Sequence, residues 1–128
     1  MDMRGFAMAE FINPSRAMIC DYVIYRGRVL ETVIVPIPDG SDRPVPGGPA
    51  AEMREIFRQL DEVLRAAGAE RTHVVSVKLF LQHVNRDIAA VNEVYRDYFQ
   101  DHAPMRFAVG AELQAGMLIE VAFTAELP

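Results

Sequence analysis

The chain has 128 residues, of which 51% are apolar and 24% charged, and its formal net charge is −5 with a pI near 5.1. This size and composition predict a single folded domain over residues 1–128, and the acidic balance argues against a protein that binds nucleic acid or an anionic membrane surface. One cysteine excludes an internal disulfide framework and no apolar run is long enough to span a membrane, so we expect a cytoplasmic protein.

Strand-like patterns dominate the first third of the chain. Segments Ala17–Tyr25 and Val29–Val35 are rich in β-branched and aromatic residues, and Arg26–Gly27 between them predicts a tight hairpin turn. Phe6–Ile12 is predicted to add an edge strand. The segment 36–49 then holds five prolines and three glycines, a composition that predicts a loop between elements.

Two helical patterns follow, separated by a strand. The first helix is predicted to begin at Pro49 and to end at Gly68. Its apolar residues recur at spacings of three and four: Met53, Ile56, Leu60, Val63, Leu64 and Ala67. The alternation in Val74–Leu81 predicts a strand with one covered face. Asn85 or Asp87 is then predicted to cap a second helix. The apolar face of that helix would consist of Ile88, Val91, Tyr95, Tyr98 and Phe99.

Two final strands complete the pattern. They are predicted over Arg106–Glu112 and Leu118–Thr124, joined through Gln114–Gly116. Four or more strands with two helices predict an α+β layer in which both helices cover one face of the sheet. The other face keeps many apolar residues without a helix to cover them, which favours oligomerisation.

Common catalytic motifs are absent from the sequence. His73, His83 and His102 have no metal-ligand spacing, so no metal site is expected. Cys20 lies in an apolar predicted strand, which is typical of a buried and unreactive thiol.

Two charged residues near the C-terminus are candidates for a site. Arg106 begins a predicted strand, where a guanidinium can bind a carboxylate through two parallel hydrogen bonds. Glu120 interrupts an apolar run, so its carboxylate either points to solvent on the alternating face or lies in a pocket as an acid–base group. From the residues alone, an ordinary surface charge is the alternative for both.

Four segments together are similar to a known family. They are 64–78 (LRAAGAERTHVVSVK), 91–99 (VNEVYRDYF), Pro104–Arg106 and Leu118–Val121. This set resembles the Rid family, the reactive intermediate deaminases that are also called YjgF-like or L-PSP proteins, in which the last two segments read Pro-Ala-Arg and Val-Glu-Ile-Glu. Ser15–Ala17 also resembles the start of many divergent members.

The resemblance implies a chorismate-mutase-like α+β fold and a homotrimer with three clefts, each between neighbouring subunits. It implies hydrolysis of carboxylate-bearing enamines or imines to 2-oxo acids and ammonia, without a metal or another cofactor. In this family Arg106 would hold the substrate carboxylate and Glu120 would orient or activate the attacking water. The backbone at Ala108 would contact the substrate nitrogen, and Asn92 corresponds to a helix asparagine near the site. An imine carbon is already electrophilic, so orientation and proton handling suffice for this reaction.

Two segments depart from the family pattern. Ile19 stands in place of the site tyrosine of Gly-Pro-Tyr-Ser, and Thr32–Ile34 replace Ser-Gly-Gln, so Ile19 and Thr32 would belong to a more apolar wall. Glu31 adds an acid beside that wall. The wall would suit a longer substrate of the aminomuconate type. The same losses leave an alternative open, a non-catalytic trimer that binds small carboxylates or a partner protein at these clefts. Ribonuclease activity is disfavoured by the net charge of −5 and the lack of a Lys/Arg cluster.

Overall fold

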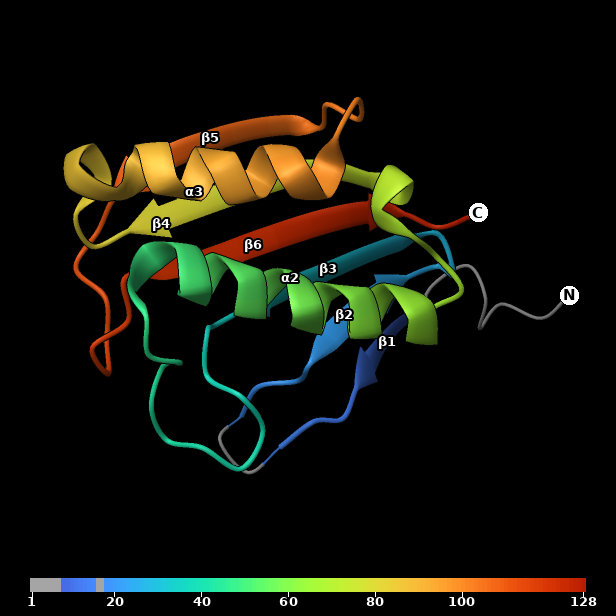
Figure 1. The fold of residues 1–128 in the computed structure, drawn as a ribbon. Coiled ribbons are helices and arrows are strands. Elements are labelled where there is room, and N and C mark those ends of the chain that lie inside the picture. The colour runs from blue at the N-terminus through green and yellow to red at the C-terminus, as the bar shows by residue number, and fades with distance from the viewer. Residues whose placement is uncertain (1–7, 16–17) are drawn as a thin grey trace, which may run out of the picture.

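A six-stranded sheet with two helices on one face makes up the part of the chain that the computed structural model describes, residues 8–15 and 18–128 (Figure 1). The strands are β1 Ala9–Ile12, β2 Tyr22–Tyr25, β3 Val29–Ile34, β4 Val74–Leu81, β5 Met105–Gly110 and β6 Ile119–Glu126. The helices are α2 Gly48–Ala66 and α3 Val84–Phe99, and a 3-10 turn, η1 Arg71–His73, precedes β4. The predicted α+β layer with two helices on one face is therefore confirmed.

The strand order places the end of the chain in the middle of the sheet. The order is β1-β2-β3-β6-β4-β5, with β4 and β5 parallel and all other neighbours antiparallel. A parallel pair needs a crossover, and α3 supplies it between β4 and β5. Both β1 and β5 are edge strands. In register, Arg106 on β5 lies beside Val77, and Glu120 on β6 lies beside Phe80.

Helix α2 agrees with its predicted bounds because local signals mark both ends. Pro49 lies in the first turn after Gly47, which has a φ of 114°. At the other end Gly68 adopts a φ of 76°, and the N–H of Ala69 donates to the carbonyl of Leu64 at 2.8 Å. This left-handed glycine closes the helix and satisfies its last carbonyls.

The predicted cap of the second helix is wrong. Helix α3 begins at Val84 with His83 as its cap residue, and no side chain caps it. Asn85 lies inside the first turn. Asp87 is buried and accepts two hydrogen bonds from Arg86, at 2.7 and 3.0 Å. Because Asp87 has Arg86 as a partner, its carboxylate serves that ion pair instead of the helix end.

The predicted strand Ala17–Tyr25 is too long. Residues 18–21 lie outside β2, since Met18 has a φ of 65°, a left-handed conformation that a strand excludes. The chain turns here, and the N–H of Asp21 donates to the carbonyl of Ile12 at 2.8 Å. Cys20 consequently lies half-buried in a loop, not in a strand. Residue 17, like residues 6 and 7 of the predicted edge strand, lies outside the described residues. β1 confirms residues 9–12 of that edge strand, and Met8 lies before it.

The two C-terminal strands are shifted from their predicted ends. β5 stops at Gly110, two residues before Glu112, and β6 runs two residues beyond Thr124. The connecting loop contains Ala115 and Gly116, both with positive φ, where the predicted turn lies.

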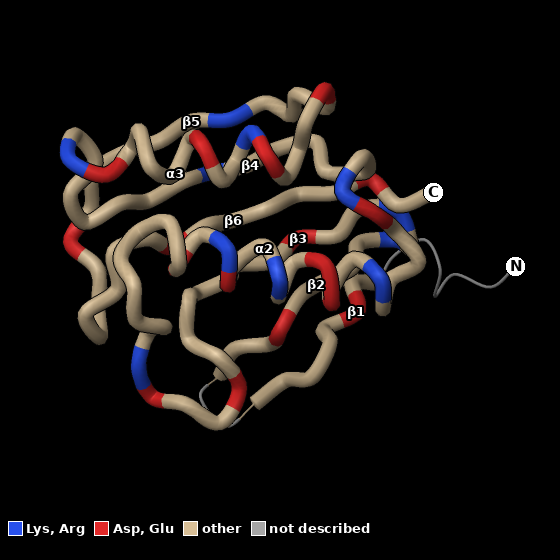
Figure 2. Tube along the Cα trace, viewed as in Figure 1, with Lys and Arg blue, Asp and Glu red and all other residues tan. Residues whose placement is uncertain are grey.

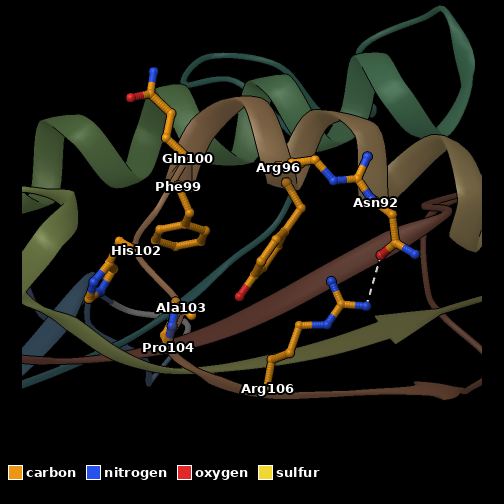
Figure 3. Close-up of a pocket in the computed structure, with 9 residues that line it drawn as sticks. Asn92, Arg96, Phe99, Gln100, His102, Ala103, Pro104 and Arg106 are labelled. Carbon is orange, nitrogen blue, oxygen red and sulfur yellow. Dashed lines mark hydrogen bonds between the residues drawn. The ribbon is translucent and has the colours of Figure 1, made fainter.

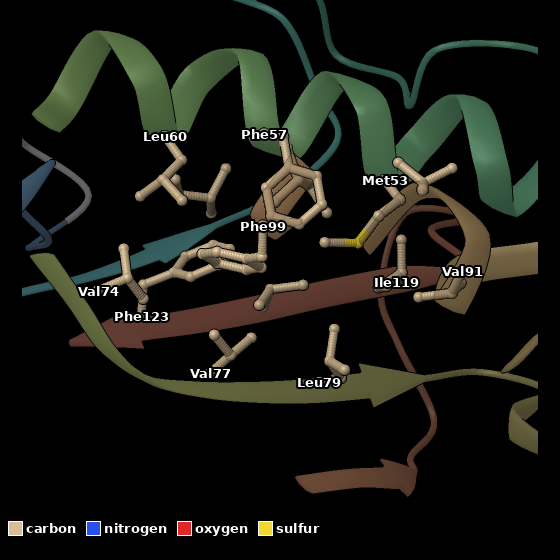
Figure 4. Packing of buried hydrophobic residues seen from close by; sticks show 14 of the residues in the cluster. Met53, Phe57, Leu60, Val74, Val77, Leu79, Val91, Phe99, Ile119 and Phe123 are labelled. Carbon is tan, nitrogen blue, oxygen red and sulfur yellow. The ribbon is translucent and has the colours of Figure 1, made fainter. Parts of the chain in front are cut away.

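The core fills the space between the helices and the sheet (Figure 4). Helix α2 packs onto Leu79 and Phe123 of the sheet through the side chains of Met53, Phe57 and Leu60. Burying each such side chain contributes about 1.5–3 kcal/mol, so this layer holds both helices in place. Of the helices in the described ranges, none combines the length and apolarity that crossing a bilayer requires.

The face of the sheet opposite the helices, which we call the open face, is uncovered in the described chain. Side chains that alternate with the core residues point to it. Those on the central and β5 strands include Val33, Phe80, Phe107, Val109, Glu31, Lys78 and Glu120. Val33 is 60% exposed and Phe107 42% exposed, and Phe107 meets Phe80 edge to face at 6.1 Å. Exposed apolar side chains on this scale mark an interaction surface.

Candidate active site

A cavity of about 390 Å³ opens between α3 and the start of β5, and we call it the Arg106 pocket (Figure 3). Arg106 reaches it because residue 106 lies beside Val77, on the helix side of the sheet. Asn92, Tyr95 and Arg96 line it from α3, and His102 lines it from the segment before β5.

Two side chains of α3 hold the Arg106 guanidinium. Its Nη2 donates to Asn92 Oδ1 at 2.8 Å, and its Cζ lies 4.6 Å from the centroid of the Tyr95 ring. A guanidinium carries five N–H donors in a planar fork, so one hydrogen bond and one stacked face leave donors for a ligand. This arrangement presents a positioned cation that can bind a carboxylate.

Tyr95 and His102 complete the polar lining of this pocket. The Tyr95 hydroxyl is buried and has no hydrogen-bond partner among the residues that the structure describes. Burial raises the pKa of Tyr95, and the positive charge of Arg106 partly opposes that shift. His102 Nε2 lies 2.6 Å from the carbonyl oxygen of Val74, so this nitrogen carries a proton and donates it. His102 is thereby fixed in orientation.

A second cavity of about 390 Å³ lies at the other side of the molecule, and we call it the Thr32 pocket. Ile19 and Thr32 both line it, together with the carboxylates of Asp21, Asp39 and Glu62. Thr32 is only 4% exposed, and its hydroxyl donates to the carbonyl of Asp21 at 2.8 Å. The proton of Thr32 is therefore already used to hold the loop before β2.

Glu120 and Ala108 lie outside both cavities. Glu120 is half-buried on the open face, beside Phe80. Ala108 follows Arg106 on the helix side of β5 and packs at the margin of the core. As β5 is an edge strand, one row of its backbone N–H and C=O groups has no strand partner in the described chain.

Within one chain, the structure therefore groups the six predicted site residues only in part. Arg106 and Asn92 meet in one pocket, and Ile19 and Thr32 line the other. Arg106 and Glu120 are not brought together, because they lie on opposite faces of the sheet with β4 between their strands.

The pocket also contains residues that the sequence patterns did not assign to a site. Tyr95 was predicted only as part of an apolar helix face, although its spacing of three from Asn92 places both on one side of α3. Arg96 and His102 carried no signal beyond their charge. Among the described residues, no group of three or more His, Cys, Asp or Glu side chains is arranged to hold a metal ion.

Comparison with known proteins identifies the family. The family model described as Endoribonuclease L-PSP matches residues 21–127. The rat 2-iminobutanoate/2-iminopropanoate deaminase is 37% identical over 108 residues, which cover 84% of this chain and 74% of that protein. The human protein of the same name is 34% identical with the same coverage.

Solved structures share the fold. The Rid-family protein YyfA of Yersinia pestis superposes with a TM-score of 0.84 at 25% identity, over 94% of this chain and 100% of that one. Yeast Mmf1 superposes with a TM-score of 0.83 at 20% identity and the same coverage. With the sequence matches across most of its length, the chain belongs to the Rid family, also described as YjgF-like or endoribonuclease L-PSP proteins.

Proposed function

We propose that this chain hydrolyses a carboxylate-bearing imine or enamine to a 2-oxo acid and ammonia, in clefts shared between the copies of a homotrimer. The observation that carries the proposal is the guanidinium of Arg106, held by Asn92 and Tyr95 in a pocket with no carboxylate among its described lining residues. The mammalian relatives are named for two imines that bear a carboxylate. Because the single cysteine is free, we expect the protein to work in the cytoplasm.

The chemistry asks for orientation and proton transfer. A water oxygen adds to the imine carbon, and its proton passes to the imine nitrogen. The carbinolamine then loses ammonia as the C–N bond breaks and the C=O bond forms. An enamine first takes a proton on carbon to become the imine. No electron changes hands and the carbon is already electrophilic, so the reaction requires neither a metal nor another cofactor.

Four of the six predicted residues have a role in this scheme. Arg106 binds the substrate carboxylate through its free donors, and Asn92 fixes the guanidinium. Glu120 takes the proton from water and returns it to the nitrogen. The edge backbone at Ala108 contacts that nitrogen.

The placement of Arg106 and Glu120 on opposite faces of the sheet supports a cleft shared between copies. A neighbouring copy has to supply Glu120 if both are to reach one substrate. Val33 on the central strand β3 and Phe107 on the edge strand β5 are both exposed on the open face, so a head-to-tail contact between copies across this face would cover both. Head-to-tail contacts close into rings, and a trimer is the ring that the family resemblance implies.

The wall of the Thr32 pocket supports a longer substrate. Ile19, Val33 and Ile34 line it with apolar atoms. If this wall faces the cleft, a substrate of the aminomuconate type, with a chain longer than three or four carbons, buries more apolar surface there.

One observation favours a second function, a non-catalytic trimer that binds a small carboxylate or a partner protein. The Thr32 hydroxyl is occupied by the carbonyl of Asp21, and Ile19 offers no polar group. Without a free hydroxyl at Thr32 or a polar group at residue 19, the cleft has fewer polar atoms for catalysis. Binding of a carboxylate by Arg106 does not depend on either group.

RNA cleavage is poorly supported despite the family description. Figure 2 shows acidic and basic residues interspersed along the described chain, with no basic stripe. The net charge of −5 opposes binding to a phosphate backbone.

The deciding experiment measures imine loss. Imines are made in situ by an amino-acid oxidase, and the remainder is trapped with semicarbazide. We expect Arg106→Ala to lower kcat/KM about a hundredfold through loss of the carboxylate contact, while Arg54→Ala, an exposed arginine on α2, leaves it unchanged. If wild type hydrolyses every imine no faster than Arg106→Ala does, the proposed deaminase function is wrong. In that case a rise in melting temperature with 2-oxo acids, abolished in Arg106→Ala, identifies the binding module.

A further inference from the structure

The Arg106 pocket contains a second arginine. Arg96 lines it from α3, and His102 adds an ionisable imidazole, whereas no Asp or Glu is among the described residues that line it. Figure 3 shows Arg96, Asn92 and Arg106 at the same end of the pocket. The Thr32 pocket is different, since three carboxylates line it. Positive charge is therefore concentrated in the Arg106 pocket.

Asn92 lies between the two arginines in the lining of this pocket. Arg96 follows Asn92 by four residues, so the two occupy the same side of α3 about 5–6 Å apart at Cβ. Asn92 in turn accepts the hydrogen bond from Arg106 at 2.8 Å. Both arginines therefore neighbour one asparagine and line one pocket, where a ligand with two carboxylates can meet both.

Arg106 and Arg96 differ in how they are held. Arg106 is half-buried, bonded to Asn92 and stacked on Tyr95. Arg96 is exposed, and within the described ranges it has no ion pair. A held cation can orient a reacting group, while an exposed one at the mouth can attract a second charge without fixing its position.

We infer that the substrate is a dianion, the imine of a dicarboxylic amino acid, with its α-carboxylate on Arg106 and its distal carboxylate at Arg96. This inference rests on the proposed deaminase function and names the substrate class. One carboxylate neutralises only Arg106 and leaves the second cation in place. A second carboxylate neutralises both, and a cavity of about 390 Å³ has room for the longer chain.

The reaction is unchanged by the second carboxylate. Water adds its oxygen to the imine carbon, the C–N bond breaks, and nitrogen leaves as ammonia. The product is a 2-oxo dicarboxylate. The distal group contributes binding only, so its effect belongs in KM and in the salt dependence of kcat/KM.

The test compares the imines of glutamate and methionine, which have similar length and differ in the distal charge. We expect wild-type protein to prefer the glutamate imine. Arg96→Gln, which removes the charge and keeps a polar side chain, is expected to raise KM for the glutamate imine about three- to tenfold and to leave KM for the methionine imine unchanged. Added salt should weaken the reaction of the glutamate imine more than that of the methionine imine, because the former has two charged contacts and the latter one. Arg54→Gln on the exposed side of α2 is the control, with neither substrate affected.

Three results overturn the inference. In the first, Arg96→Gln keeps the wild-type preference for the glutamate imine. In the second, it slows hydrolysis of both imines equally. In the third, its mass in light scattering differs from that of wild type, which would make Arg96 an interface residue. If these occur while wild type still hydrolyses the methionine imine in an Arg106-dependent manner, the deaminase function survives alone. If wild type hydrolyses neither imine, both the deaminase function and the dicarboxylate substrate are refuted.

Discussion

Arg106 binds a carboxylate well only if its planar fork is held at one angle. A free arginine side chain loses rotamer entropy on binding, and a stacked one has already lost it. The Tyr95 ring, 4.6 Å from Cζ, supplies the flat surface that holds the plane of the guanidinium. Asn92 fixes rotation within that plane through one hydrogen bond. We therefore expect the ring of Tyr95, and not its hydroxyl, to contribute to the binding of a carboxylate at Arg106.

Two substitutions at Tyr95 separate the ring from the hydroxyl. Tyr95→Leu removes the stacked surface, and KM for the imine is expected to rise about two- to thirtyfold, the range of a cation–π contact. Tyr95→Phe keeps the ring and removes a buried hydroxyl without a described partner, so KM stays at its wild-type value. Steady-state kinetics below the melting temperature of each variant measure both. Equal impairment of the two variants would assign the effect to the hydroxyl and refute the role of the ring.

At the scale of elements, one buried carboxylate joins α2 to the start of β6. Glu52 is 3% exposed, and its Oε1 accepts the N–H of Leu118 at 2.8 Å. Burial raises the pKa of Glu52, the N–H groups of Leu118 and Ile119 oppose the shift, and the nearby Asp87 adds to it. The contact anchors the strand that carries Glu120.

This raised pKa sets the sign of a stability effect. Below the ordinary pKa of a glutamate, Glu52 is protonated in both the folded and the unfolded state, so its burial costs no stability through its charge. As pH rises toward the higher pKa of the folded state, the unfolded chain loses its proton first and stability falls. Glu52→Gln keeps an oxygen for the Leu118 N–H and removes the charge. We expect its melting temperature to exceed that of wild type by a few degrees at neutral pH and to match it at acidic pH, measured by calorimetry.

The neighbouring Glu55 provides a matched control with the opposite sign. Hydrogen bonds from Arg58 lower the pKa of Glu55, so its carboxylate stabilises the fold above the ordinary pKa, and that stabilisation is lost as pH falls. Glu55→Gln should therefore melt lower than wild type at neutral pH. If both variants shift in the same direction, the charge of Glu52 is not the cause.

The elements also show how far sequence patterns reach. Helix α2 was predictable because Pro49, Gly68 and a three-to-four spacing act locally. The loop that replaces the predicted strand at residues 18–21 was not predictable, because the left-handed Met18 depends on how the loop packs against the end of β1. The parallel pairing of β4 with β5 depends on contacts far apart in sequence, which no local pattern contains.

The candidate site divides in the same way. Asn92 and Arg106 were assigned by family resemblance, and they do meet, whereas their stacking partner Tyr95 was taken for an ordinary apolar helix position. The separation of Arg106 from Glu120 arises from strand order and pleat together. Neither the strand order nor the face on which each side chain lies can be predicted from the number of residues between Arg106 and Glu120.

At the scale of the whole molecule, the two residues proposed for catalysis lie on surfaces that do not meet within one chain of 14.3 kDa. Arg106 faces the helix side at the β5 edge, while Glu120 lies on the open face. We propose that copies of the chain associate through the apolar open face, which would bring different surfaces of two copies together. Light scattering should then give three times the mass of one chain.

Mixing two inactive variants tests this division of the site. Arg106→Ala and Glu120→Gln are each expected to be nearly inactive alone. If the cleft takes Arg106 from one copy and Glu120 from the next, co-refolding equal amounts creates some clefts with both residues intact. For random assembly into a head-to-tail ring, about a quarter of wild-type activity should return. Mixing without unfolding is the control and should restore nothing if the trimers do not exchange subunits. A co-refolded sample of trimer mass that stays inactive would show that both residues act within one chain. A Glu120→Gln variant that is active alone would show that Glu120 has no part in catalysis.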